Sequence, residues 1–476
     1  HIKRAAIIKR GSSMIYFTLD NIPSHKRIAR FRKCCNQSHT KLISNGKGVL
    51  SQIVIDFGGL MTKLYQKVSS YEAQKGSVKR VVLLYSGGLD TSCILKWIQD
   101  EYQAEVITVT LDLGQQVDDL KAIQKKALAL GAKAAYVLDA RDEFAERYLS
   151  YAIKANGTYQ HDYYVSTISR YLIAEKAIEI TEQEKADAIA HGCTGKGNDQ
   201  IRIEATCLAL KPDIKIIATV REWALGREEE LEYAKQHGIE VPTREDFPYS
   251  SDDNMWGITW ESGEIEDLSA VPKVEKFLTV TPIEKTPDKP EFIELGFKEG
   301  IPVSLNGKSM KLATLIRECN LAGSRHGVGV KYMVEDRVVG LKVRGVYEHP
   351  GAEIIISAHR KLEALVSTRL ENEFKTLVDL KWGELCYSAQ WFDPLMGDLN
   401  AFCAKLNERV TGKVKLKLFK GKAEVVALES PFAIYDDKLA TFMKDYSFNQ
   451  NCSASFIELY SLQMKLANQK IRESKK

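Results

Sequence analysis

From Lys79 onward, short apolar runs alternate with amphipathic helical segments. The run RVVLLYS ends in a pair of glycines and predicts a buried strand that enters a loop. The next segment, TSCILKWIQDEY, places Ile94, Trp97 and Ile98 on one helical face. Further apolar runs follow at AEVITVTLDLG, KAAYVLDA, ADAIAHG and DIKIIATV, separated by helical segments. This alternation is typical of a doubly wound, mostly parallel α/β sheet, which we expect to occupy residues 79–240.

The pattern changes after Pro242. Prolines recur through a loop-rich region, and runs with strand-like alternation follow, such as KYMVEDRVVGLKVRGVYE. We therefore expect a second domain of the α+β class over residues 241–445. The tail, residues 446–476, has helical periodicity from Phe456 and a basic end. A terminal helix of this kind either caps its own domain or packs on another subunit, and the pattern does not choose between them.

Residues 1–78 form a basic extension without sustained periodicity. The first 60 residues contain eleven Lys or Arg against two Asp. Three interpretations are open: an organellar transit peptide, a nucleic-acid-binding arm, or an incidental, disordered extension upstream of a start at Met61. We favour the incidental extension. The rest of the chain is close to neutral, which argues against a nucleic-acid partner.

Composition sets further bounds on the class of protein. The chain has 476 residues, of which 44% are hydrophobic and 27% are charged, as in globular proteins of two or three domains. Its nine cysteines are scattered without a C-x-x-C pair, which indicates reduced intracellular thiols and no zinc site. No apolar run approaches the roughly 18 residues of a membrane span. We expect a soluble, cytoplasmic protein without a membrane partner.

The loop SGGLDTS, residues 86–92, carries the first candidate chemistry. Its two glycines let backbone N–H groups close on anionic oxygens, and the helix that follows adds a partial positive charge. Ser86, Thr91 and Ser92 add hydroxyl donors. The loop lacks the lysine of a Walker A motif and the spacing of a dinucleotide fingerprint. It predicts a pyrophosphate site; the alternative is a plain turn in which Asp90 caps a helix.

A second glycine-rich loop, residues 190–204, follows a later strand with the sequence AHGCTGKGNDQIRIE. Its glycines permit close backbone approach, and Lys196 can meet phosphate charge. Thr194, Asn198 and Asp199 offer the donors and acceptors that hold an amino acid. A surface loop would explain the glycines, but it would not explain this set of polar residues.

Together the two loops resemble known enzymes. SGGLDTS is similar to the motif of the PP-loop ATP pyrophosphatases, and with HGCTGKGNDQIR it resembles the argininosuccinate synthases. Further matches follow in the same order: EYAKQHGIEVP, YSSDDNMWGITWE, GSRHGVGVKYMVEDR and RGVYEHPGAEI. The resemblance runs from about Lys79 to the C-terminal helix.

The resemblance implies an ATP-dependent, AMP-forming C–N ligase. Such enzymes condense citrulline and aspartate to argininosuccinate through a citrullyl-adenylate, use Mg²⁺, and release AMP and pyrophosphate. They serve arginine biosynthesis or the urea cycle. The resemblance also implies a homotetramer in which the C-terminal helix crosses between subunits.

The site residues that the resemblance implies fall into three groups, with Asp90, Asp199 and Arg202 as the catalytic candidates and no metal ligand assigned to the protein. The ATP group comprises Leu84, Tyr85, Ser86, Gly87, Gly88, Leu89, Asp90, Thr91, Ser92, Leu111 and Gly192. The aspartate group comprises Thr194, Asn198 and Asp199. The citrulline group comprises Tyr163, Thr167, Asn198, Arg202, Ser250, Thr259, Glu335 and Tyr347.

One stretch departs from the family pattern Y-x-x-G-T-S-x-A-R-P. Aligning on Arg170 places Thr167 at the family's serine, but whether Tyr163 or Tyr164 faces citrulline stays open. Within the second loop, Cys193 is interpreted as a small filler and not as a nucleophile, because no partner base is evident nearby.

Two alternative functions remain for comparison. Another AMP-forming PP-loop enzyme, such as a tRNA-thiolating or amidating one, would need C-x-x-C pairs or a glutaminase domain, and neither is found in the sequence. A non-catalytic nucleotide-binding protein would not need the full set of polar residues in both loops.

Overall fold

The computed structural model describes most of the chain after residue 68. The described ranges are 69–116, 119–223, 227–240, 249–276, 278–443 and 449–475, together with four short N-terminal strands. These strands form two antiparallel hairpins, β1 (Ala5–Arg10) with β2 (Ser13–Thr18) and β3 (Thr40–Ile43) with β4 (Gln52–Ile55). The sequence pattern did not predict these hairpins. The remainder of the predicted extension before residue 69 lies outside the described residues.

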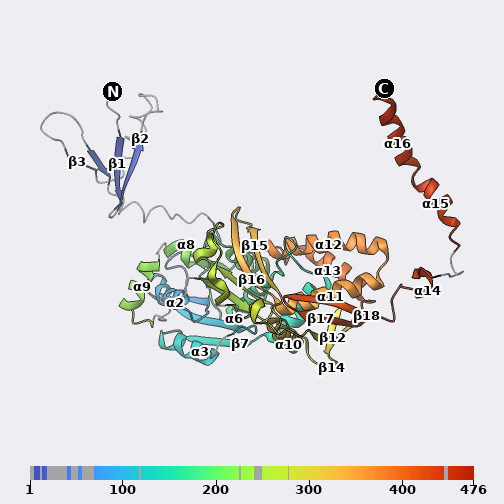
Figure 1. The fold of residues 1–476 in the computed structure, drawn as a ribbon. Helices are drawn as coiled ribbons and strands as arrows, with labels where there is room; N and C mark the ends of the chain where they lie inside the picture. The colour runs from blue at the N-terminus through green and yellow to red at the C-terminus, as the bar shows by residue number, and fades with distance from the viewer. Residues whose placement is uncertain are drawn as a thin grey trace.

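A five-stranded parallel sheet forms the first part of the folded body (Figure 1). Its strands, in spatial order, are β7 (Ala134–Asp139), β6 (Glu105–Asp112), β5 (Arg80–Leu84), β8 (Ala188–His191) and β9 (Lys215–Ala218). The strand order reverses between β5 and β8, so the loops after these two neighbouring strands open at the same edge of the sheet. That switch point is where doubly wound sheets bind their ligands.

Helices cover both faces of this sheet. On one face, Leu83 packs with α2 (Leu89–Tyr102) and α3 (Leu120–Ala129). On the other face, Val82 packs with α6 (Ser169–Gln183) and α7 (Asp199–Leu210). Adjacent strand residues point to opposite faces, which explains why the runs are apolar throughout. The doubly wound α/β class predicted from the sequence is confirmed. Two further helices, α8 (Thr219–Trp223) and α9 (Arg227–Gln236), follow β9.

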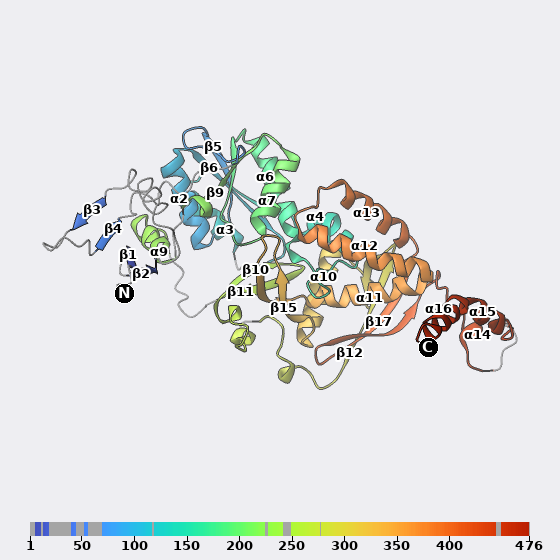
Figure 2. The same ribbon diagram turned by 90° about the horizontal axis from the view of Figure 1, so that it is seen from above.

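Two antiparallel sheets form the second part. A four-stranded sheet has the order β10 (Ser250–Asn254), β11 (Gly257–Glu261), β16 (Lys342–Glu348) and β15 (Val330–Asp336). A five-stranded sheet has the order β14 (Lys308–Ser309), β13 (Ile301–Leu305), β12 (Glu291–Lys298), β17 (Gly412–Phe419) and β18 (Lys422–Glu429). The four-stranded sheet lies between the parallel sheet and the large helices (Figure 2).

The helices of the second part are α10 (Leu312–Arg325), α11 (Pro350–Val366), α12 (Arg369–Tyr387) and α13 (Pro394–Asn407). Short 3₁₀ turns occupy the loop-rich region: η4 (Gly263–Glu266), η5 (Lys273–Lys276) and η6 (Ile283–Lys285). The end of α12 supplies Tyr387, which lies deep in the molecule and is 1% exposed.

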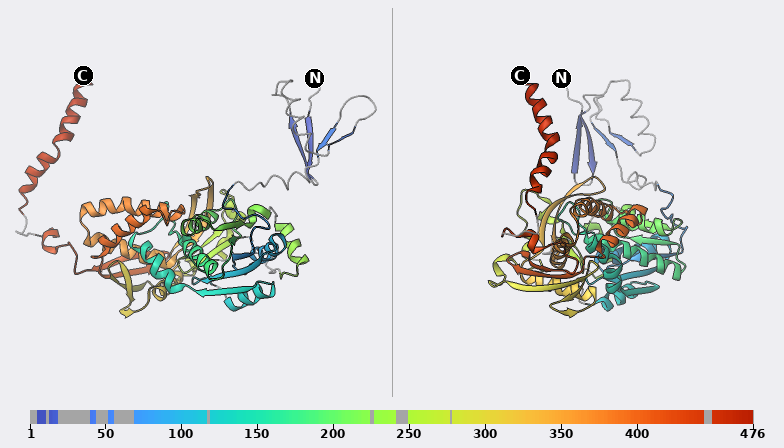
Figure 3. Two further views of the ribbon diagram at one scale, coloured as in Figure 1. Left: turned by 180° about the vertical axis from the view of Figure 1, so that it is seen from behind. Right: turned by 90° about the vertical axis from the view of Figure 1, so that its right-hand side faces the viewer.

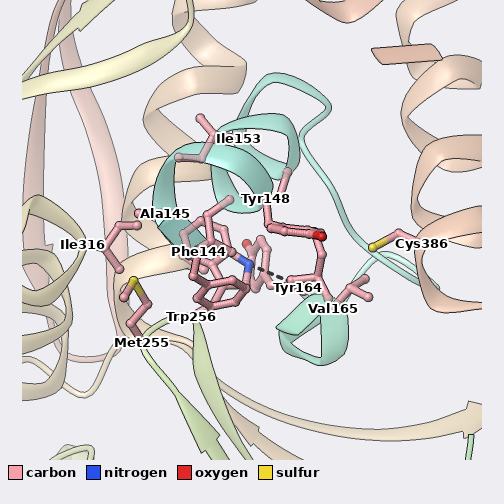
Figure 4. Close-up of a cluster of buried hydrophobic side chains, with 14 of the residues drawn as sticks. Phe144, Ala145, Tyr148, Ile153, Tyr164, Val165, Met255, Trp256, Ile316 and Cys386 are labelled. Atoms are coloured by element: carbon pink, nitrogen blue, oxygen red, sulfur yellow. Dashed lines mark hydrogen bonds between the residues drawn. The ribbon is translucent and has the colours of Figure 1, made fainter. Parts of the chain in front are cut away.

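The segment between β7 and α6 joins the two parts. It contains α4 (Arg141–Phe144), a π-helical turn η2 (Ala145–Leu149), α5 (Ser150–Lys154) and a 3₁₀ turn η3 (Ser166–Ile168). Tyr148 stacks on Trp391, with ring centroids 5.0 Å apart, and the Trp256 indole donates to the Tyr164 carbonyl at 2.8 Å. Figure 4 shows Tyr148, Tyr164 and Trp256 together in this cluster. One continuous apolar core therefore spans both parts.

Residues 69–78 belong to the folded body. The amide of Ala73 donates to Ile216 of β9 at 2.9 Å, and the amide of Ile216 donates to Tyr71 at 3.0 Å. Ala73 and Val78 are buried. The body therefore extends about ten residues before the boundary expected at Lys79, because edge strand β9 has a free side on which a neighbouring segment can pair.

The C-terminal segment stands away from the body. After the short α14 (Asp437–Ala440), helices α15 (Cys452–Tyr460) and α16 (Leu462–Glu473) project from it, on the same side as the N-terminal strands (Figure 3). None of their described residues is buried. The predicted terminal helix is confirmed, broken near Ser461. Within the described ranges, no helix has the length and apolar character that a membrane crossing requires.

Candidate active site at the sheet switch point

The first glycine-rich loop connects β5 to α2 and is braced from inside. Gly87 has a φ of +81°, and a Cβ there would lie 2.8 Å from the Ile123 side chain, so only glycine fits. The Ser92 hydroxyl is fully buried and donates to the Gly88 carbonyl at 2.7 Å. Ser92 thus braces the loop from inside. Lys126 of α3 donates to the Gly87 carbonyl at 2.9 Å.

The other ATP-group residues divide into exposed and buried ones. Ser86, Gly88 and Asp90 are exposed at the edge of the sheet, where the α2 N-terminus begins. Four predicted contacts instead have buried or partly buried side chains that pack the strands and the helix beneath the loop: Leu84, Tyr85, Leu89 and Leu111. The partly buried Thr91 hydroxyl bonds Ser86 at 3.1 Å. The loop therefore offers mainly backbone N–H groups to an anion.

The second glycine-rich loop leaves β8 and leads into α7. Its first turn is tied down by His191, whose Nδ1 accepts the Cys193 amide at 3.2 Å while its Nε2 bonds Glu204 at 3.1 Å. Burial raises the pKa of the Cys193 thiol to about 12, so the thiol stays neutral near pH 7. This favours the filler interpretation. Asn198 then precedes the first residue of α7, Asp199.

A cluster of charges surrounds Asp199. Its carboxylate accepts from Arg170 at 2.9 Å and from Arg202 at 2.7 Å. Burial alone would raise the pKa of Asp199, but the two guanidiniums outweigh burial and lower the pKa to about 2. Arg170 also pairs with Asp252 of β10 at 2.6 Å, and Arg202 donates to the Tyr387 carbonyl at 2.8 Å. These contacts bind the first part to the second.

The second part contributes side chains from three adjacent strands. Thr259 of β11 is directly opposite Tyr347 of β16, so both lie on one face of the sheet. Glu335 lies near the end of β15 and is 5% exposed. The Tyr347 hydroxyl is buried without a hydrogen-bond partner in the described part of the chain. Such an orphaned donor points to a ligand contact.

These elements enclose a cavity of about 330 Å³. Every residue predicted to bind aspartate or citrulline lines it, and so do two of the ATP group, Asp90 and Gly192. The remaining ATP-group residues are not among its lining residues. The cavity therefore gathers residues from two loops and from a second sheet. Asp90 of the first loop and Tyr347 of that sheet are 257 positions apart in the sequence.

The two candidate tyrosines lie in different surroundings. Tyr163 lines the cavity, and its hydroxyl lies 3.2 Å from that of Thr167. Tyr164 points elsewhere and donates to Glu353 at 3.0 Å. Between them and Thr167, Val165 adopts a left-handed conformation with φ +45°, which is strained for a β-branched residue.

Several lining residues were not predicted from the sequence. The charged ones are Arg170, Asp252, Glu261 and Arg337, and the large aromatic one is Tyr387. Arg170, Asp252, Glu261 and Arg337 lie in segments that the family resemblance had already drawn attention to. Tyr387 lies on a helix in no motif, and only its packing under Arg202, 4.8 Å from the ring centroid, identifies it.

Comparisons with known proteins agree with this arrangement. The model of the "Arginosuccinate synthase N-terminal HUP domain" matches residues 80–240, and that of the "Arginosuccinate synthase C-terminal domain" matches residues 249–467. The argininosuccinate synthase of Geobacillus kaustophilus is 48% identical over 81% of this chain and 95% of its own length. That of Pyrococcus furiosus is 49% identical over 82% and 94%, and that of Bacillus subtilis 47% over 82% and 96%.

A solved U34-tRNA thiolase from Methanococcus maripaludis aligns at 16% identity and a TM-score of 0.24, over 40% of this chain and 67% of that one, which supports no argument. The two family models, by contrast, match in chain order and together span most of the sequence. The chain therefore belongs to the argininosuccinate synthase family.

Proposed function

We propose that the protein is an argininosuccinate synthase: it condenses citrulline and aspartate at the expense of ATP and releases AMP and pyrophosphate. The observation that carries the proposal is the single cavity that joins the edge of a phosphate-binding loop to buried amino-acid ligands from two sheets. In this proposal residues 79–240 bind the nucleotide and residues 241–445 complete the amino-acid site.

The chemistry needs positioning more than a protein nucleophile. The ureido oxygen of citrulline forms a bond to the α-phosphorus of ATP, and the bond to pyrophosphate breaks. The amine of aspartate then forms a C–N bond to the activated carbon, the C–O bond to AMP breaks, and the amine loses its proton. Both steps move negative charge onto phosphate oxygens, which aligned donors stabilise.

The residues of the chain suit these tasks. Backbone N–H groups of residues 86–92 and the α2 N-terminus would hold the departing pyrophosphate. The ionised Asp199 and the guanidinium of Arg202 would bind zwitterionic amino acids, since each charge meets its opposite. Buried walls such as Thr259 and Tyr347 exclude water from the adenylate.

Magnesium would arrive with the nucleotide. Among the described residues, no cluster of three or more His, Cys, Asp or Glu is arranged to hold a metal ion. Magnesium typically takes one or two carboxylates together with substrate phosphates and water, and Asp90 lines the cavity beside the loop. When bound, the ion supplies neutralising charge for the leaving pyrophosphate.

A three-substrate assay tests the proposal. The purified protein should form AMP and pyrophosphate in steady state only when citrulline, aspartate and Mg-ATP are all present. Exchange of labelled pyrophosphate into ATP should require citrulline but not aspartate, because the adenylate forms before aspartate reacts. ATP turnover that is indifferent to citrulline would overturn the assignment.

We also propose a homotetramer in the cytoplasm. The apolar side chains of α15 and α16 are exposed, among them Phe456, Ile457, Leu459, Tyr460, Leu462 and Met464, as expected of a helix that packs on another subunit. All seven cysteines in the described residues are free, which suits a reducing compartment. Sedimentation should give four times the chain mass, and a chain ending at residue 445 should sediment as a smaller species. Equal sedimentation of both would contradict the role of the helix.

A further inference from the structure

The tip of the β15–β16 hairpin lies against the second glycine-rich loop. The Gly340 amide donates to the Arg337 carbonyl at 2.8 Å and closes a four-residue turn between the strands. From this turn, the Val338 amide donates to the Asn198 side-chain oxygen at 3.0 Å, and Arg337 donates to the Lys196 carbonyl at 3.3 Å. The turn therefore bridges the two parts of the molecule above the cavity.

We propose that this hairpin tip orients Asn198 and thereby selects the atom that Asn198 can bind in the amino-acid substrate. The inference rests on the proposed function and goes beyond the residues assigned from the family. Of the two polar atoms of the asparagine amide, only the oxygen can accept from a backbone N–H, so Oδ1 faces Val338. Asn198 lines the cavity and is 6% exposed, and with Oδ1 held by Val338 its NH₂ group, Nδ2, is turned away from that amide and available to a substrate.

A donor at this position requires an acceptor on the substrate. The matching atoms are a carboxylate oxygen of either amino acid or the ureido oxygen of citrulline. With the amide turned by 180°, Asn198 would present an oxygen and favour the opposite class of group. The Val338 amide thus removes one of two orientations before the substrate arrives, which lowers the cost of binding.

Arg337, the first residue of the same turn, holds two neighbouring carboxylates in place. Its Nη2 lies 2.7 Å from Glu261, its Nε lies 3.2 Å from Glu335, and its Nη1 reaches Lys196. Because Arg337 contacts Glu261, Glu335 and the Lys196 carbonyl at once, it acts as a positioning residue. One guanidinium against two carboxylates leaves a net negative charge, which suits the α-ammonium of an amino acid.

A backbone substitution tests the role of the Val338 amide. Val338→Pro removes the N–H, and proline suits the second position of a four-residue turn, so the hairpin should persist. Val338→Ala is the control, because it keeps the N–H and loses most of the side chain. Its effect on KM measures the contribution of the side chain, which is subtracted from the effect of Val338→Pro. Beyond the effect of Val338→Ala, we expect Val338→Pro to raise the KM for aspartate, citrulline or both by roughly 3- to 10-fold, the range for one neutral hydrogen bond. The KM for ATP should change less than twofold.

A double-mutant cycle separates orientation from general damage. In an Asn198→Ala background there is no amide to orient, so Val338→Pro should add less than a twofold further change. Asn198→Asp provides a second variant: it keeps an oxygen for the Val338 amide but replaces the Nδ2 donor by an acceptor. We expect it to raise the same KM at least tenfold, with a melting temperature close to that of the wild type.

The outcomes are distinct. A full Val338→Pro effect in the Asn198→Ala background, or equal KM values for Val338→Pro and Val338→Ala, would overturn the inference and leave the proposed function standing. Wild-type protein whose ATP turnover ignores citrulline and aspartate would overturn both. If Val338→Pro fails to fold, a normal KM in Asn198→Asp would still refute the requirement for a donor.

Discussion

The carboxylate of Asp199 is a charge that holds two guanidiniums of the site together. It is shared by Arg170 and Arg202, at 2.9 and 2.7 Å. The substitution Asp199→Asn keeps the shape of the side chain and removes its charge. Two buried guanidiniums would then face each other with Asp252 as the remaining carboxylate partner of Arg170. We expect losses both in stability and in the use of aspartate.

The size of the stability loss follows from the titration of Asp199. Its pKa lies at about 2 in the folded protein against 3.8 in the unfolded chain. At about 1.4 kcal/mol per tenfold change in acidity, the carboxylate contributes on the order of 2 kcal/mol. Because the pKa is lowered on folding, this contribution is complete above about pH 4 and is lost as the pH falls through about 2. For a body of about 375 residues melting as one unit, it corresponds to roughly 3 °C in Tm.

Two measurements check the reasoning. At pH 7, the Tm of Asp199→Asn should lie below that of the wild type by the amount given above. Asp139→Asn is the matched control, because its carboxylate is 61% exposed and pairs with Arg141 on the surface, and its Tm should fall by less than half as much. In steady-state kinetics, Asp199→Asn should raise the KM for aspartate by roughly 10- to 100-fold, as for the loss of a charged hydrogen bond. The KM for ATP should change less than threefold, because the phosphate loop follows a different strand. A wild-type KM for aspartate, or equal melting of the two variants, would refute the argument.

Three further predictions concern the fold around the site. Burial raises the pKa of Asp253 to about 7, so the folded protein loses stability as the pH rises from about 4 to 7 and this carboxyl ionises. The Tm of Asp253→Asn minus that of the wild type should therefore be larger at pH 8 than at pH 5. A difference in Tm that does not depend on pH would contradict this. Gly257→Ala should abolish folded expression, since its Cβ would lie 1.9 Å from Nδ1 of His349, the residue that follows β16. Gly397→Ala on α13 is the control: its Cβ would have nothing within 4 Å, and the variant should melt like the wild type. Removing residues 1–68 should preserve AMP formation. Removing residues 1–78 should lower both Tm and activity, because it also removes the segment that pairs with β9. Loss of activity on removal of residues 1–68 would assign the extension a role.

Much of this protein is determined by local sequence. The apolar runs after Lys79 specify parallel strands because burial on both faces needs no alternation, and the loops SGGLDTS and HGCTGKGND specify anion and amino-acid chemistry through glycine freedom and polar side chains. The end of α3 illustrates the same point: Gly131, just past the helix, has a φ of +91°, a conformation that glycine adopts readily. These features depend on neighbours within a few residues, so periodicity and motif are sufficient to predict them.

Only the tertiary structure decided the contacts between distant segments. It placed Tyr163 in the cavity and Tyr164 outside it, although the two are adjacent, because neighbouring side chains of extended backbone point to opposite sides. It also brought Tyr387 beneath Arg202 and the Val338 amide to Asn198, across separations of 185 and 140 residues. No local period encodes such pairs, because they arise when two sheets pack around one shared core and buried polar groups must each find a partner.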